Sequence, residues 1–277
     1  MSGRYAAFTF VDRITALVPG VSARGVFHIP ADVGGFPSSL LAEATGQLAA
    51  WVAVAKLGFR LRPVAGIAHE TVYHGVPKPG DLLETEIRID SCEDDAVAYQ
   101  GWARIAGVEV LELHDCVGPM LPLEQFDDPL AMRTFFETLC GEGARPDRFP
   151  GIEPVRLTPL EHEPGRVTMA QLDVPVADSL FDDHFPRRPV FPGTLLLDRM
   201  TALAGSVVEE AADGAPALLE RVTDVKLRTF TEPGSRLQLR ATVDEVAQDR
   251  IAVLLEARAE GQRRPVGAAR AQFRVQR

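Results

Sequence analysis

The sequence predicts an α+β protein in which one unit, a long helix with an antiparallel sheet, occurs twice in tandem. Each half has an apolar segment that follows a Phe-Pro pair, Phe36-Pro37 and Phe191-Pro192. Later stretches alternate apolar and polar residues, which is typical of strands with one face on a core. Anchors recur in the same order at similar separations: Pro30 and Pro175, Glu43 and Asp198, and Pro79-Gly80 and Pro233-Gly234. A repeated order of anchors indicates two copies of one unit.

The elements expected in each copy follow the same order. A short N-terminal segment and a strand come first, then a loop and the long helix. Strand-like stretches follow the helix at 69–74, 82–89, 96–105 and 108–117 in the first copy, and at 222–230, 236–246, 251–259 and 266–275 in the second. Pro-Gly pairs and Ala106-Gly107 are suited to the turns between these strands.

The helix of the second copy is expected to begin at Pro192-Gly193. Segment 194–208 has little polar surface on any side, which predicts a helix that is buried on most sides. Asp198 lies within it. Because burying a lone carboxylate is costly, we expect this side chain to have a partner, a proton or a function.

Three regions are predicted: an N-terminal unit at 1–118, a connection at 119–150 and a C-terminal unit at 151–277. The connection is rich in proline and includes a possible short helix at 130–139. At about thirty residues it is long for a simple loop, so we expect it to pack along the surface.

Composition limits the functional classes. Of the 277 residues, 46% are hydrophobic and 25% are charged, as in globular domains. We expect neither a membrane span nor secretion, since the chain has no long apolar run and no leader. Cys92, Cys116 and Cys140 lack metal-type spacing and are expected to be free thiols in a reducing cytoplasm.

The net charge of −10 argues against a nucleic-acid-binding protein. It leaves room for an acidic carrier protein as the partner, because a local basic patch could form. Its members would be Arg187, Arg188, Arg199, Lys226 and Arg228. A solvated surface is an equal alternative for the same side chains.

The most specific motif is His184-Phe-Pro-Arg-Arg-Pro-Val-Phe-Pro-Gly193, followed by Asp198 five residues after the glycine. Three prolines stiffen this loop. The motif resembles that of the β-hydroxyacyl-carrier-protein dehydratases of fatty-acid and polyketide synthesis. The opening segment, Phe8-Thr9-Phe10-Val11-Asp12-Arg13, resembles the opening Phe-x-x-Val-Asp-Arg of the same family. This resemblance implies the hotdog fold, here as a double hotdog with the two sheets side by side. The alternative without a catalytic role is that His184 is a loop histidine capped by Asp182 or Asp183.

The two copies are unequal around this motif. Pro30 and Pro175 are 145 positions apart, whereas Glu43 and Asp198 are 155 apart, so the second copy has ten additional residues there. They include the histidine loop, which the first copy lacks. The first copy keeps Gln47 four residues after Glu43, on the same helical face, and Glu-x-x-x-Gln resembles the helix motif of the family.

In the family, each active site takes its histidine from one hotdog unit and its acid from the other. The resemblance therefore implies one complete site, with His184 from the second copy and Glu43 and Gln47 from the first. The opposite site would hold Asp198 without a histidine. Spacing alone leaves a pair of His184 with Asp198 open.

The remaining histidines are expected to have ordinary roles. His28 lies fifteen residues before Glu43, but the repeat aligns it with Asp173, on a strand, so we interpret it as structural. We find no motif for a metal, a nucleotide or a serine nucleophile. The others, in strand or turn stretches, are His69, His74, His114 and His162.

The resemblance implies dehydration of a 3-hydroxyacyl thioester. Neutral His184 would take the proton from C2, and the backbone N–H of Gly193, at a helix N-terminus, would bond the thioester oxygen. Glu43, protonated or sharing a proton, would donate to the leaving hydroxide or orient it, with Gln47 holding the carboxyl or a water. No organic cofactor is needed. The substrate would be carried on a phosphopantetheine arm of an acyl carrier protein or of coenzyme A.

Further expectations concern specificity and assembly. Three leucines near the acid, Leu40, Leu41 and Leu195, are candidates for limiting acyl chain length in a tunnel between the helices, although simple core packing is an equal alternative. The chain is expected to work as a monomer that forms an internal pseudo-dimer, with homodimerisation open. Two other functional classes remain: a different hotdog activity on acyl thioesters, such as hydrolysis or enoyl isomerisation, and a non-catalytic subunit of a synthase.

Overall fold

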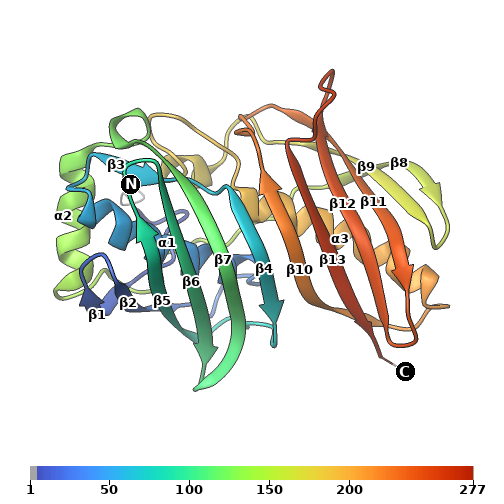
Figure 1. Ribbon diagram of the computed structural model, residues 1–277, viewed down its shortest axis with the longest axis horizontal. Helices are drawn as coiled ribbons and strands as arrows, with labels where there is room; N and C mark the ends of the chain where they lie inside the picture. Colours follow the sequence, from blue (N-terminus) through green and yellow to red (C-terminus); the bar gives the residue numbers. More distant parts are fainter. Residues whose placement is uncertain (1–4, 277) are drawn as a thin grey trace.

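The computed structural model describes residues 5–276 and shows one large antiparallel sheet with two long helices against it (Figure 1). The first half contributes β1 (Arg13–Val18), β2 (Ser22–His28), β3 (Leu61–Pro63), β4 (Ile67–Tyr73), β5 (Leu82–Cys92), β6 (Ala96–Ile105) and β7 (Val108–Pro122). The second half contributes β8 (Leu157–Glu163), β9 (Val167–Asp173), β10 (Ala217–Leu227), β11 (Arg236–Val246), β12 (Arg250–Ala259) and β13 (Gly267–Val275).

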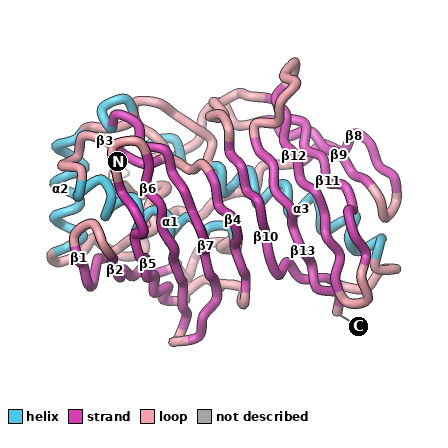
Figure 2. The backbone as a smooth tube through the Cα atoms, viewed as in Figure 1, coloured by secondary structure: helices cyan, strands magenta, loops and turns pink. Residues whose placement is uncertain are grey.

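The strands follow the order β1-β2-β5-β6-β7-β4-β10-β13-β12-β11-β9-β8, and β3 pairs with β7. The two halves of the sheet meet where β4 pairs with β10, with Thr71 opposite Val222. An ion pair between Arg221 and Glu70, 2.5 Å apart, spans the same joint. The sheet is therefore continuous across the two halves, as the tube drawing also shows (Figure 2).

Helix α1 (Ser39–Lys56) packs against β2, β5 and β6, and helix α3 (Gly193–Ala211) packs against β9, β11 and β12. Both lie behind the sheet in the view of Figure 1. Helix α1 ends where Gly58 and Phe59 take positive φ angles of 64° and 63°, because left-handed residues stop a helix. The first buried core cluster includes residues of both halves, so the helices are packed into a shared interior.

The expected strands agree with the structure to within a few residues at most ends, and 96–105 and 236–246 match β6 and β11 at both ends. Strand β7 continues past the predicted boundary at 118 to Pro122, so part of the expected connection belongs to the sheet. The 3₁₀ helices η1 (Leu123–Gln125) and η2 (Ser179–Asp182) are short additions.

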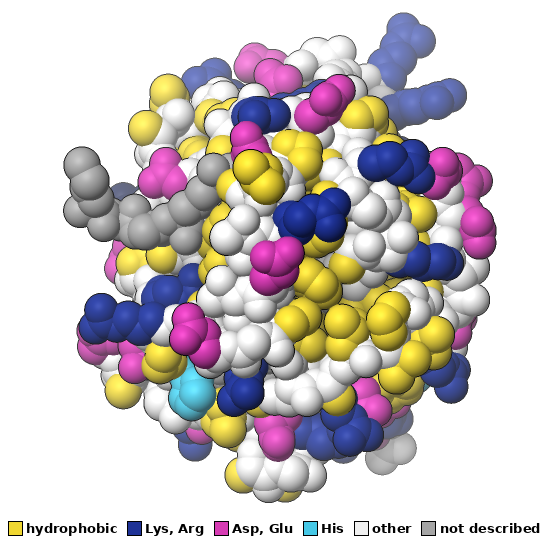
Figure 3. All heavy atoms as spheres, turned by 90° about the vertical axis from the view of Figure 1, so that its left-hand side faces the viewer, with side chains coloured by type: hydrophobic (Ala, Val, Ile, Leu, Met, Phe, Trp, Pro, Cys, Tyr) yellow, Lys and Arg dark blue, Asp and Glu magenta, His cyan; other side chains and the backbone are white. Residues whose placement is uncertain are grey.

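Helix α2 (Pro129–Cys140) lies in the connection, where a short helix was expected. Asp128 caps it by accepting hydrogen bonds from the N–H groups of Leu130 and Ala131, at 2.9 and 3.0 Å, a standard way to satisfy the first turn. Phe136 of α2 stacks on Trp51 of α1, which fixes the connection against the first half. Figure 3 shows this end of the molecule, where hydrophobic side chains gather near the centre and charged ones surround them.

Cys92, Cys116 and Cys140 are free cysteines, as predicted. Across residues 5–276, the helices are all too short or too polar to cross a membrane.

Candidate active site

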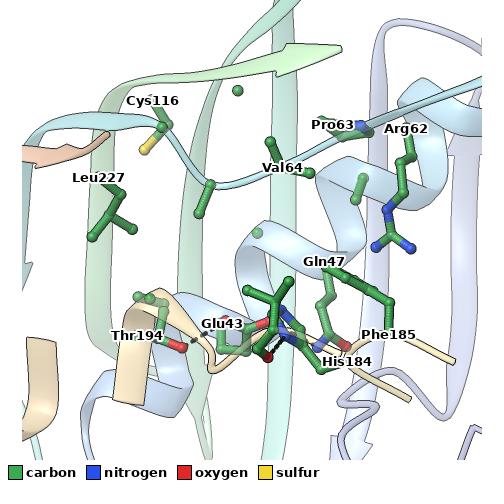
Figure 4. A pocket seen from close by; sticks show the side chains of 18 of the residues that line it. Glu43, Gln47, Arg62, Pro63, Val64, Cys116, His184, Phe185, Thr194 and Leu227 are labelled. Atoms are coloured by element: carbon green, nitrogen blue, oxygen red, sulfur yellow. Dashed lines mark hydrogen bonds between the residues drawn. The ribbon is translucent and has the colours of Figure 1, made fainter. Parts of the chain in front are cut away.

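A cavity of about 240 Å³ lies between the two halves. Helix α1 supplies one wall through its half-buried face, and the loop 183–191 and the first turn of α3 supply another. The segment 62–68 and strand β7 cover it. The structure brings four predicted site residues to this cavity. Three of them, His184, Glu43 and Gln47, are labelled in Figure 4, and the fourth is Gly193.

His184 has a defined tautomer when it is neutral. Its Nδ1 lies 2.7 Å from the carbonyl oxygen of Val190, and a carbonyl oxygen only accepts hydrogen bonds, so Nδ1 carries the hydrogen. The lone pair is then on Nε2. The ring stacks on Phe185, with centroids 4.0 Å apart, and meets the edge of Phe8 at 5.3 Å. These contacts fix the ring in one orientation.

The surroundings of His184 favour the neutral imidazole. Burial lowers its pKa, and the positive charge of Arg62 acts in the same direction. The carboxylate of Glu43 and the carbonyl of Val190 oppose this change, but burial is the larger effect. A neutral imidazole at ordinary pH is the form that can accept a proton.

Asp183 ties the histidine loop to the N-terminal segment of the other half. Its carboxylate accepts three backbone hydrogen bonds, from the N–H groups of Tyr5 at 2.8 Å, Ala7 at 2.7 Å and Phe8 at 3.0 Å. Because Phe8 also packs on His184, this clamp positions the ring indirectly. The interpretation of His184 as a histidine capped by Asp182 or Asp183 is therefore wrong.

Both carboxylate oxygens of Glu43 have partners. The Nε2 of Gln47 donates to Oε1 at 2.9 Å, and the hydroxyl of Thr194 donates to Oε2 at 2.6 Å. Gln47 is itself held by the backbone, since its Oε1 accepts from the N–H of Phe10 and its Nε2 donates to the oxygen of Phe8. Glu43 on α1 is thus oriented by its own helix and by α3.

Gly193 is the first residue of α3, so its N–H has no carbonyl one turn earlier in the helix to bond. A Cβ at this position would lie 2.2 Å from Cδ1 of Leu227. A side chain at this position would therefore require Leu227 or the start of the helix to move. The N–H group and the helix dipole suit a partially negative oxygen.

Asp198 lies elsewhere. It lines a separate cavity of about 20 Å³, together with Pro37 and Leu195, and accepts a hydrogen bond from the Nε of Arg199 at 3.0 Å. It does not line the cavity of His184, so the structure does not place these two residues together. His28 is half-exposed and lies 3.4 Å from Asp12, outside both cavities.

The three leucines proposed to limit chain length were chosen wrongly. Leu40 and Leu41 are fully buried on the core-facing side of α1, and Leu195 lines the smaller cavity. The apolar lining of the larger cavity near the acid comes instead from their neighbours Ala42, Leu196 and Leu197. Successive helical residues are about 100° apart around the axis, so a shift of one residue changes the face.

Sequence reasoning missed Thr194 and Arg62, and it considered Asp183 only as a cap of His184. Thr194 directly follows the motif glycine, and its place in the first turn of a helix beside the site was the available signal. Arg62 gave no such signal, because it lies in a short segment far from any motif. Among the described residues, His74, Glu109 and Glu112 are spaced closely enough to hold a metal ion, but they lie outside the cavity.

The comparisons with known sequences agree with the motif. A family profile described as ApeI dehydratase, of the ApeI-like family, matches residues 161–262. The chain is 33% identical over 111 residues to the 3-hydroxyacyl-[acyl-carrier-protein] dehydratase FabZ of Latilactobacillus sakei, covering 39% of this chain and 76% of that protein. It is 30% identical over 89 residues to the FabZ of Rickettsia bellii, covering 31% of this chain and 61% of the relative.

Solved structures share the fold across nearly the whole chain. A putative oleoyl thioesterase from Lactobacillus plantarum aligns with a TM-score of 0.60 at 11% identity, over 92% of this chain and 97% of that one. A putative thioesterase II from Thermobifida fusca aligns with a TM-score of 0.54 at 16% identity, over 100% and 98%. These likenesses confirm the predicted α+β double hotdog. Together with the sequence matches, they show that the chain belongs to the hotdog-fold family of 3-hydroxyacyl-[acyl-carrier-protein] dehydratases.

Proposed function

We propose that the protein dehydrates a 3-hydroxyacyl thioester to the 2-enoyl thioester, with His184 as the base and Glu43 as the acid. One observation carries this proposal. The Nε2 of His184, which bears the lone pair, and the carboxyl group of Glu43, which is held by two hydrogen bonds, line one cavity although they come from different halves. Membership of the dehydratase family supports the reaction class.

The first step is proton removal. His184 Nε2 takes the proton from C2, and the electron pair of the C2–H bond moves toward the thioester carbonyl. The N–H of Gly193 stabilises the charge that develops on the carbonyl oxygen. The imidazole starts neutral and becomes positively charged when it takes the proton. The carbonyl oxygen of Val190, which accepts the Nδ1–H hydrogen bond, stabilises this new charge.

The second step is loss of the hydroxyl group. The electron pair returns to form the C2–C3 double bond as the C3–O bond breaks, and Glu43 supplies a proton so that water leaves. Glu43 ends as a carboxylate and His184 as an imidazolium, so proton exchange between them, through solvent, restores the starting state. The chemistry needs no organic cofactor in this proposal.

The carrier of the acyl group is proposed to be an acyl carrier protein, in fatty-acid or polyketide-type biosynthesis, with coenzyme A as the alternative. The names of the FabZ relatives support this choice. The basic patch is smaller than expected, because Arg199 is paired with Asp198 and Arg187 is paired with Asp128. Arg188, Lys226 and Arg228 remain exposed and are the proposed contacts.

A direct assay tests the proposal. The purified chain is incubated with 3-hydroxyacyl thioesters on acyl carrier protein, on coenzyme A and on pantetheine, and mass spectrometry follows loss of water. Release of free thiol without loss of water would identify a thioesterase instead, and conversion between enoyl isomers alone would identify an isomerase. The absence of all three reactions with the wild-type chain would favour the non-catalytic subunit.

A further inference from the structure

Arg62 is a cation inside the cavity with unused hydrogen-bond donors. Within residues 5–276, nothing accepts a hydrogen bond from its buried Nε, and no ion pair engages its guanidinium. The central carbon lies 3.8 Å from the centroid of the Phe185 ring, so the aromatic ring covers one face of the group. Stacking of this kind leaves the N–H edge of a guanidinium free to bind an oxygen.

The guanidinium lies beside the hollow of the cavity. Arg62 lines the same cavity as His184 and Glu43. In Figure 4 its side chain extends from its strand toward Gln47 and Phe185. Burial lowers the pKa of Arg62 to about 10, and the negative charge of Asp127 opposes the change from a distance. The group is therefore a cation at neutral pH, and a partly buried cation with an unmet buried donor favours a ligand that supplies acceptors.

The position of Arg62 relative to the proposed reaction indicates which part of a substrate it meets. The thioester oxygen belongs at Gly193, beside Leu227, and the acid Glu43 lies further along the cavity. Leu227 and Arg62 lie on opposite sides of the Glu43–His184 pair in Figure 4. A chain that places C1 at Gly193 and C3 at Glu43 continues toward Arg62.

Exposure of the lining supports the same direction. Near Leu227 the lining includes Ile67, which is 49% exposed, and the exposed Thr229, so this side opens to solvent. The lining on the side of Arg62 includes Trp51, Val54 and Met132, all buried. The carrier arm therefore enters beside Leu227, and the distal acyl group reaches the side of Arg62.

We propose that Arg62 binds an oxygen acceptor on the acyl chain beyond C3, and that a carboxylate is the best match. The substrate class would then be 3-hydroxyacyl thioesters with an anionic or strongly polar distal group. A carboxylate can take two parallel N–H···O bonds from a guanidinium, which a methyl end cannot. This inference rests on the proposed function for the direction of the chain, because the thioester is placed at Gly193.

The test measures binding rather than turnover. The probes are two saturated acyl-pantetheine analogues of equal length, one ending in methyl and one in carboxylate. A methylene group replaces the sulfur, so neither dehydration nor hydrolysis can occur. Calorimetry with the wild-type chain should show about 10- to 100-fold tighter binding of the carboxylate analogue, the usual range for a charge-assisted hydrogen bond.

Two variants complete the test. Arg62→Met should abolish the preference for the carboxylate, and Arg62→Lys, which keeps the charge but loses the planar fork, should retain part of it. Thermal unfolding checks that each variant is folded, and Arg62→Lys alone decides the question if Arg62→Met does not fold. Equal binding of the two analogues by the wild type, no binding of either, a preference that survives in Arg62→Met, or one that is undiminished in Arg62→Lys would overturn the proposal.

One further outcome would also overturn it. If Arg62→Met weakens both analogues equally, Arg62 contacts the pantetheine arm that they share rather than the acyl end. The dehydration assay on methyl-ended 3-hydroxyacyl pantetheine is run separately on the wild type. Failure of that assay with the carboxylate preference intact would refute the reaction and leave the binding site in place, so the two failures are distinguishable.

Discussion

The hydroxyl of Thr194 on α3 lies 2.6 Å from Oε2 of Glu43 on α1, and so bridges the two halves at the proposed acid. A hydroxyl can donate to a carboxylate or accept from a carboxylic acid. Thr194 can therefore stay bonded to Glu43 in both of the protonation states that a general acid must adopt during turnover.

Replacing Thr194 by valine should lower kcat/KM by about 10- to 100-fold, because a hydrogen bond to a charged group is worth about 1.5–3 kcal/mol. Thr194→Ser keeps the hydroxyl and is the matched control, so it should retain most of the activity. Steady-state kinetics on a 3-hydroxyacyl thioester measures both. Equal losses in the two variants would show that the methyl group, not the hydroxyl, matters.

The pH dependence should reflect the lowered pKa of His184. A base works only when neutral, so the acid limb of kcat/KM should lie below the value of about 6.5 that an unperturbed imidazole would give. In Arg62→Met the limb should move to higher pH, because Arg62 contributes to lowering this pKa. A limb that does not move would argue against His184 as the titrating group.

The free energy of unfolding should also fall as the pH is lowered, because the pKa of His184 is lowered in the folded state. The folded pKa of His184 is below the unfolded value, so the unfolded state binds more protons in this range. The contribution of His184 to folding stability is therefore complete above the unfolded pKa of about 6.5, and it is lost as the pH falls through the folded pKa. Urea unfolding of the wild type and of His184→Asn, compared between neutral and mildly acidic pH, measures this difference.

The two helix acids should be unequal. His184→Ala and Glu43→Gln should each lower kcat by about 10²- to 10⁴-fold, the usual contribution of general acid–base catalysis. Asp198→Asn should cost far less, since Asp198 lies in a different cavity. His28→Ala should resemble an ordinary strand substitution. If Asp198→Asn were inactive and Glu43→Gln active, with both variants folded, the result would indicate that His184 works with Asp198 instead.

Gly193→Ala should be strongly impaired, because the new Cβ would lie 2.2 Å from Cδ1 of Leu227. The added methyl group must displace either Leu227 or the start of α3, which carries the proposed oxyanion donor. The double variant Gly193→Ala/Leu227→Ala should recover part of the lost kcat. Without any recovery, the requirement for glycine would have a cause other than this contact.

Asp183→Asn should destabilise the fold by about 1–3 kcal/mol, because its NH₂ group would face backbone N–H groups that now donate to a carboxylate. Asp182→Asn, at an exposed neighbouring position, is the control and should be nearly neutral. Denaturant unfolding gives both values. Comparable stabilities would mean that the N-terminal segment does not depend on this clamp.

Local patterns in the sequence were enough to predict both long helices and the strands that follow them from β4 to β7 and from β10 to β13, but not the second strand before each helix or the short β3. Alternation and turn residues act over a few positions, so β6 and β11 could be bounded from the sequence alone. The histidine loop was also local, since its prolines and glycine form one continuous motif.

The missed features depend on contacts between distant segments. Thr194 meets Glu43 151 positions away, and Asp183 meets Ala7 176 positions away. No periodic pattern encodes such pairs in a single sequence. The error over Leu40 and Leu41 has a different cause, because only the packing of α1 decides which of two neighbouring residues faces the cavity.

The joining of β4 to β10 within one chain has a consequence for how this protein can change. In a dimer of identical units every substitution occurs twice, so loss of the histidine loop would remove both bases at once. Here each half has its own sequence, and each could lose what the other supplies. The halves are no longer interchangeable: a chimera with two first halves would have two acids and no base, and one with two second halves would have two histidine loops and no Gln47.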